Sequence, residues 1–194
     1  MIHMKKKILV LGVIVIALAI LASGTIAYFT AEDTARNVIT SGGVDIALHE
    51  WQKEGANLVP YPDEPIEIAP GSVVSKIAEV ENLDADAWIR AKLEITVTDR
   101  NEQVMGLNEE ELAKIISLDL DRDHWIEQDG WFYYNQALKI GESTEPIFTQ
   151  VTFSGPGMKN QYQKANLEIT VIAQGVQMAN NGDNALEAAG WPEE

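Results

Sequence analysis

The sequence feature that most limits the fold is a two-residue alternation of apolar and polar side chains. It is clearest in two ten-residue stretches, WIRAKLEITV at 88–97 and LEITVIAQGV at 167–176. Successive side chains of a β-strand point to opposite faces, so this alternation predicts two strands, each with one apolar face. We expect six apolar residues of these strands to be buried in the core: Ile89, Leu93, Ile95, Leu167, Ile169 and Val171.

Further stretches carry a strand pattern, and turn-forming residues separate them. The strand-like stretches are VDIALHE at 44–50, VVSKIAEVEN at 73–82 and IFTQVTF at 147–153. In the last of these the alternation places one set of residues on a single face: Ile147, Thr149, Val151 and Phe153. The turn signals include SGG at 41–43, APG at 69–71, IGES at 140–143 and SGPG at 154–157.

One stretch predicts a helix, NEEELAKIIS at 108–117. Asn108 can cap it, and three glutamates fill the first turn, where the helix dipole favours acids. Leu112, Ile115 and Ile116 share one face of this helix. Short strands, Gly/Pro turns and a single helix together predict an all-β fold, a jelly-roll-like β-sandwich with one short inserted helix. A closed barrel is the alternative that the same pattern leaves open.

The amino-terminal segment has the organisation of a secretory signal peptide. Three lysines precede the apolar run ILVLGVIVIALAILA at 8–22. As a helix this run is roughly 22 Å long at about 1.5 Å per residue, shorter than a bilayer core of about 30 Å. Thr25 and Ala27 occupy the −3 and −1 positions of a cleavage site, so we expect a signal-peptide helix that is removed before Tyr28. An uncleaved membrane anchor is the alternative.

These features predict four segments. They are a signal peptide at 1–27, an extended arm at 28–43, a β-sandwich domain at 44–178 and an acidic carboxyl-terminal tail at 179–194. Loss of the leader removes three lysines and lowers the formal net charge from −16 to −19. A chain of this charge repels nucleic acid and anionic lipid, so we expect contact with a membrane only through an uncleaved leader. The absence of cysteine excludes disulfides and thiolate chemistry.

No motif in the sequence predicts catalysis or a cofactor. His49 lies in HEW without the second histidine of a zinc helix, and no spacing links it to His124. The acidic turn at 119–130 matches three positions of a calcium loop, but His124 replaces the required glycine and Gly130 the bidentate glutamate. We therefore expect a solvated turn there, with weak calcium binding as the alternative. The aromatic run WFYY at 131–134 predicts core packing, with a sugar or peptide platform as the alternative.

Three stretches of the chain resemble one family. They are SGTIAYFTAEDTARNVITSGGVDIAL at 23–48, DGWFYYNQALKIGESTEPIFTQVTF at 129–153 and LEITVIAQGVQMANN at 167–181. The chain resembles the TasA and camelysin (CalY) family, exported proteins of Gram-positive bacteria with SipW-type signal peptides. It departs from the family at Ile140, where a proline is expected before the glycine.

The resemblance implies export by the Sec route, cleavage after Ala27 by a SipW-type signal peptidase, and a place outside the cell or on its surface. It also implies a fibre subunit of the biofilm matrix that joins copies of itself, with other matrix fibre proteins as further partners. Such fibres are similar to donor-strand polymers, in which an extended arm completes the sheet of a neighbour. The alternatives are a monomeric surface adhesin or accessory fibre protein, and a camelysin-like metallopeptidase.

The arm has the properties that a donor strand needs. Its side chains alternate and no proline interrupts the stretch that would pair. We expect the pairing residues to be Thr34, Arg36, Val38, Ile39 and Thr40, with the SGG stretch at 41–43 as a hinge. Pairing of the arm with its own domain is the alternative.

Overall fold

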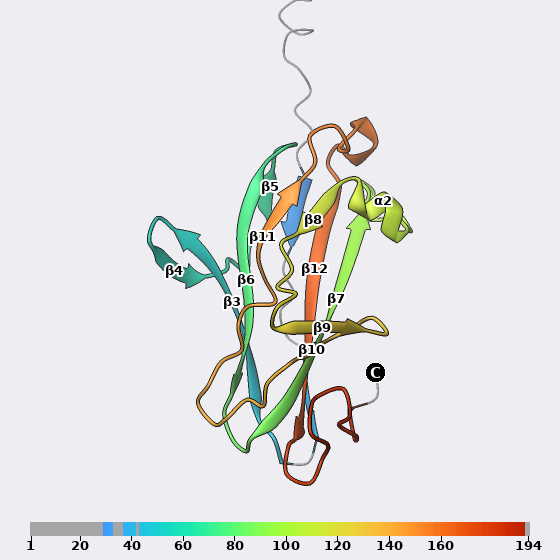
Figure 1. Ribbon diagram of the computed structural model, residues 1–194. Coiled ribbons are helices and arrows are strands. Elements are labelled where there is room, and N and C mark those ends of the chain that lie inside the picture. The colour runs from blue at the N-terminus through green and yellow to red at the C-terminus, as the bar shows by residue number, and fades with distance from the viewer. Residues whose placement is uncertain (1–28, 33–36, 42, 193–194) are drawn as a thin grey trace, which may run out of the picture.

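The structure is a computed structural model that describes residues 29–32, 37–41 and 43–192 (Figure 1). The predicted leader and cleavage residues Thr25, Ala27 and Tyr28 lie outside the described residues, as do Thr34 and Arg36 of the arm. Within the described residues the protein is an all-β sandwich of two sheets, as the alternation predicts (Figure 1). The finer jelly-roll assignment stays a prediction.

The first sheet, sheet A, is built around two long strands. β7 (Ala87–Thr98) and β12 (Asn166–Gln177) are antiparallel neighbours in register over their full length of 12 residues. The strand order is β5-β1-β12-β7-β10-β9, and β2 also pairs with β12. The remaining members are β1 (Phe29–Glu32), β2 (Asn37–Ser41), β5 (Ile66–Ile68), β9 (Trp125–Gln128) and β10 (Trp131–Tyr134).

The second sheet, sheet B, packs its apolar face on that of sheet A. Its strand order is β4-β3-β6-β11-β8. The strands are β3 (Ile46–Glu54), β4 (Asn57–Pro60), β6 (Val73–Asn82), β8 (Ile116–Leu118) and β11 (Phe148–Phe153). Two short helices complete the described chain, α2 (Glu109–Ala113) and the 3-10 helix η1 (Asn160–Tyr162).

Four of the six predicted core residues are buried, and two are not. Ile89, Leu167, Ile169 and Val171 are at most 4% exposed. Leu93 and Ile95 face the same core but are only half-buried, which corrects the prediction. The reason is that β10 pairs with β7 only at Arg90 and Ala91. Beyond Ala91 the described chain covers this side of β7 only near its end, where Thr98 forms an isolated bridge to Val104, so Leu93 and Ile95 lie at an edge of sheet A.

The predicted alternation of β11 is interrupted by a bulge. The register with β6 shifts between Phe148 and Gln150. Phe148 is therefore buried together with Val151 and Phe153, whereas Thr149, predicted to share their face, is exposed. A bulge inserts one unpaired residue and reverses the facing on one side of it, which the local pattern does not reveal.

The predicted helix at 108–117 is shorter than expected. Asn108 caps it as predicted, accepting a hydrogen bond from the backbone amide of Glu111, whose side chain accepts one from the amide of Asn108. The helix ends at Ala113, because Ile116–Leu118 instead pairs with β11 as β8. Burial of Ile115 and Ile116 in the core fixes this change from helix to strand.

The carboxyl-terminal segment packs on the outer face of sheet A. Ala185 and Ala188 join Trp88, Tyr133 and Val176 in a second apolar cluster. The indole nitrogen of Trp88 donates a hydrogen bond to the carbonyl of Asn181 over 2.9 Å. Residues 179–192, which the charge pattern presents as an acidic tail, are thus part of the folded domain.

Candidate functional site

The amino-terminal arm supplies an interior strand of sheet A, next to the edge strand β5. β1 lies between β5 and β12, antiparallel to β5 and parallel to β12. Phe29 is in register with Ile68 of β5, and Thr30 with Asn166 of β12. Both backbone edges of β1 are therefore paired, and β5 pairs with no other described strand.

β2 continues along the same edge of β12. It is also parallel to β12, and its register runs from Asn37 opposite Ile172 to Ser41 opposite Val176. Among the described strands β2 pairs with β12 alone, so its second edge is open. Val38 is 37% exposed. In this single chain the arm pairs with its own domain, the alternative to donation that the sequence left open.

Removal of the arm would leave one edge of β12 without a partner strand. The arm meets β12 at three positions through β1 and at five through β2. An uncovered strand edge presents a row of unpaired amides and carbonyls, which is a template for another extended chain. We call this edge of β12, together with the facing edge of β5, the slot. The arm fills the slot, and any chain with the same sequence could fill it.

A tight turn links the arm to the sandwich. Gly43 has φ +76°, a left-handed conformation that favours glycine, and the chain passes there from sheet A to sheet B. Val44, the next residue, is buried at 5% exposure. A Cβ added to Gly175 of β12 would lie 3.0 Å from Cγ1 of Val44, so the missing side chain makes room for Val44. Val44 is thus part of the packed domain, and the predicted hinge lies before it.

The two histidines lie in separate acid–histidine pairs. His49 Nε2 is 2.7 Å from Glu81 Oε2 on the outer face of sheet B, where the imidazole stacks on Trp51. His124 Nδ1 is 2.7 Å from Asp121 Oδ2, and this hydrogen bond raises the pKa of His124. Within the described part of the chain no group of three or more histidine, aspartate or glutamate residues is placed to hold a metal ion.

Two carboxylates of the acidic turn at 119–130 accept hydrogen bonds from backbone amides. Asp119 Oδ1 accepts two hydrogen bonds, from the backbone amides of Thr149 and Gln150, and both donor–acceptor distances are 2.8 Å. These amides lie next to the bulge of β11. Asp121 Oδ1 accepts from the amides of Asp123 and His124. Burial raises the pKa of Asp119, but the hydrogen bonds from Thr149 and Gln150 outweigh it and hold the pKa below its ordinary value.

Because the pKa of Asp119 is lowered in the folded protein, we expect the folding stability to decrease in acid. A carboxyl group with a lowered pKa in the folded state stabilises the fold above its ordinary pKa of about 3.9, and this contribution disappears as the pH falls through the folded-state pKa. Thermal unfolding of wild type and Asp119→Asn, followed by circular dichroism between pH 6 and pH 2.5, should show a difference in melting temperature that shrinks with acid. A difference that stays constant over this range would contradict the assignment.

The aromatic run is used in packing. Phe132 and Tyr134 belong to the main core, and Tyr133 belongs to the second cluster under the carboxyl-terminal segment. Trp131 is half-buried, with the guanidinium of Arg90 at 3.9 Å from the centre of its ring. Packing is thus the structural role of this run, and no exposed row of rings forms a platform at residues 131–134.

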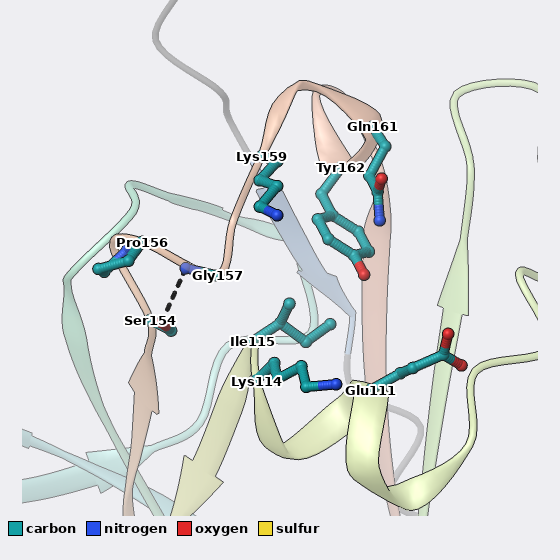
Figure 2. A pocket seen from close by; sticks show the side chains of 9 residues that line it. All are labelled: Glu111, Lys114, Ile115, Ser154, Pro156, Gly157, Lys159, Gln161 and Tyr162. Atoms are coloured by element: carbon teal, nitrogen blue, oxygen red, sulfur yellow. Dashed lines mark hydrogen bonds between the residues drawn. The ribbon is translucent and has the colours of Figure 1, made fainter.

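A cavity of about 460 Å³ lies between α2 and the loop that precedes β12 (Figure 2). Its lining combines two lysines, Lys114 and Lys159, with Glu111, Ser154 and Tyr162. Lys114 Nζ pairs with Glu110 over 3.0 Å, and Ser154 Oγ accepts a hydrogen bond from the amide of Gly157. These lining side chains contain no nucleophile held next to a base, so the cavity offers no arrangement for nucleophilic catalysis.

No family model, no curated protein and no solved structure matches the chain. The family resemblance therefore rests on the residues quoted above. The described residues contain no helix of the length and apolar character that a membrane crossing requires.

Proposed function

We propose that the protein is a secreted structural protein, a fibre subunit of an extracellular matrix that polymerises by donor-strand exchange of its amino-terminal arm. The observation that carries this proposal is the position of β1, a segment near the chain terminus inserted between β5 and β12. After the proposed cleavage behind Ala27, β1 would be a terminal segment, which can leave such a position without threading the chain through the domain. The identical segment of a second copy can then enter by β-augmentation.

The signal-peptide pattern and the family resemblance support the same proposal. Cleavage after Ala27 would leave a single residue before β1, so the mature arm would start almost where pairing starts. Exchange between successive copies forms a contact that does not close on itself and therefore extends into a filament. The proposed partners are further copies of the chain, a SipW-type signal peptidase and other matrix fibre proteins. The proposal assigns no catalytic activity and needs no cofactor.

The arm's pairing with its own domain favours a second candidate function. A chain that completes its own sheet is a self-sufficient monomer, as expected of a surface adhesin or an accessory fibre protein. In that case the arm stabilises the domain and donates nothing. The two candidates differ in whether the partner of β1 belongs to the same molecule or to a neighbour.

A disulfide trap distinguishes the two candidates, because the chain contains no cysteine of its own. In the variant Thr30→Cys/Asn166→Cys the two thiols stand at register partners of β1 and β12, within the spacing of adjacent strands that a disulfide can bridge. We expect fibres assembled from the reduced mature chain and then oxidised to give a ladder of covalent multimers on a non-reducing gel. The single variant Thr30→Cys, as control, should give dimers at most.

Two results would contradict the fibre proposal. Assembled fibres that yield only monomers on the gel would place the partner of β1 in the same molecule. Absence of fibres from the mature wild-type chain at high concentration, judged by negative-stain electron microscopy, would favour the monomeric adhesin.

A further inference from the structure

The arm leaves its slot at the same end of the sandwich at which its own domain begins. Ser41, the last residue of β2, is in register with Val176, next to the end of β12. Ile46, the first residue of β3, is in register with Asn82, the last residue of β6. Ala87 is in register with Gln177 and follows the end of β6 after a short turn. We call this end, which holds Ser41, Ile46, Asn82, Ala87 and Gln177, the carboxyl pole (lower end in Figure 1).

This geometry limits what exchange of the whole arm can build. Val44 is packed against Gly175 of its own domain, so only residues 42 and 43 would bridge two subunits. From Ser41 to Val44 the extended chain spans about 10 Å. The carboxyl poles of donor and acceptor would therefore lie against each other. In one reciprocal exchange, each subunit would fill the β12 edge of the other with its own arm. The product is a closed two-fold dimer without an open end.

The two halves of the arm are held differently, and this suggests how an open chain can form. Among the strands that the structure describes, β1 is paired on both edges, whereas β2 is paired on one edge only. If β2 leaves β12, the 11 residues between Glu32 and Val44 become a linker. Extended, this linker spans about 40 Å, close to the length of a 12-residue strand such as β12. The donor domain can then sit beyond the acceptor and keep its own slot available.

We propose that β1 alone is exchanged between subunits in the fibre, and that β2 is released from β12 to become the linker. This inference rests on the proposed donor-strand function. In the closed monomer, the pairing of β2 with β12 keeps the arm on its own domain. Its release leaves five positions of β12 unpaired, which makes assembly slow and dependent on concentration.

A second disulfide pair, compared with the first, tests the inference. Asn37→Cys/Ile172→Cys places thiols at register partners of β2 and β12, just as Thr30→Cys/Asn166→Cys does for β1 and β12. Both variants are assembled in reductant and oxidised as fibres. We expect a covalent ladder from the β1 pair, and from the β2 pair only monomers whose thiols remain titratable. Circular dichroism of the reduced proteins checks that both variants fold.

Each other outcome overturns a different statement. Ladders from both pairs would show that the whole arm is exchanged and would overturn the inference alone. An intramolecular disulfide in the β2 pair, beside a ladder in the β1 pair, would show that β2 stays on its own domain, with the same consequence. Absence of a ladder from the β1 pair in assembled fibres would overturn the donor-strand function itself.

A variant without cysteines gives an independent measurement. Residues 37–40 are replaced in one protein by the changes Asn37→Gly, Val38→Ser, Ile39→Gly and Thr40→Ser, which keep the length of the arm. Since β2 serves only as a linker in the fibre, we expect elongation at least as fast as in wild type and fewer closed dimers. A ten-fold or greater loss of elongation would overturn the inference.

Discussion

Deletion of residues 28–40 is expected to abolish fibre elongation and to leave a folded monomer of reduced stability. The deletion removes both partners of the β12 edge and the one described strand that pairs with β5. Each lost ladder hydrogen bond contributes about 0.5–1.5 kcal/mol. The pairing of β12 with β7 over 12 residues and the main core remain. Negative-stain microscopy and thermal melting measure the two effects separately.

A synthetic peptide of residues 28–40 tests whether the arm can act when it is supplied from outside the domain. Added to the deleted protein, it is expected to raise the melting temperature, because it refills the slot from outside. Added to wild-type protein in assembly, it is expected to cap growing ends. A scrambled peptide of the same composition is the matched control. Fibres that grow normally without the arm would rule out donation and favour side-by-side stacking of complete sandwiches.

Leu167→Ala is expected to be the most destabilising of the single changes considered for this core. Leu167 is fully buried in β12, in register with Val97 on one side and Ala31 of the arm on the other. Truncation of a buried leucine costs about 2–5 kcal/mol, a large share of the roughly 5–15 kcal/mol that stabilises a domain. At about 2–4 °C per kcal/mol for a chain of this size, the melting temperature should fall by about 4–20 °C.

Leu93→Ala is the matched control for this substitution. Leu93 faces the same core from β7 but is only half-buried, because β7 forms the edge of sheet A there. The same chemical change should therefore cost clearly less than it does at Leu167. Equal losses at the two sites, measured by thermal or urea unfolding, would mean that the open edge of β7 is covered in solution.

The long strands and most of their facing follow from the sequence alone, whereas the short strands β4, β5, β8 and β9 do not. β6, β7 and β12 occupy the ranges that the alternation predicts to within two residues, because the period of two is a local property of an extended chain. The cap of α2 was predictable for the same reason, since Asn108 and Glu111 are three residues apart in the chain. The pattern also predicted the extended arm and the turn at Gly43.

The exceptions arise where distant segments meet. The half-burial of Leu93 and Ile95 depends on where β10 stops pairing with β7, and the exposure of Thr149 depends on a bulge in the register with β6. The packing of residues 179–192 depends on Trp88 and Tyr133, which lie far away in the chain. In each case the deciding partner is not a sequence neighbour, so no local window contains the information.

The candidate site divides in the same way. Sequence determined that an extended, proline-free arm precedes a glycine turn and the first sandwich strand. Only the tertiary structure decided that this arm lies parallel to β12, that β1 is flanked on both edges while β2 is flanked on one, and that arm and domain meet at the carboxyl pole. The physical reason is that an unpaired strand edge exists only in an assembled sheet. Its position, direction and length are set by backbone hydrogen bonds between residues more than a hundred positions apart.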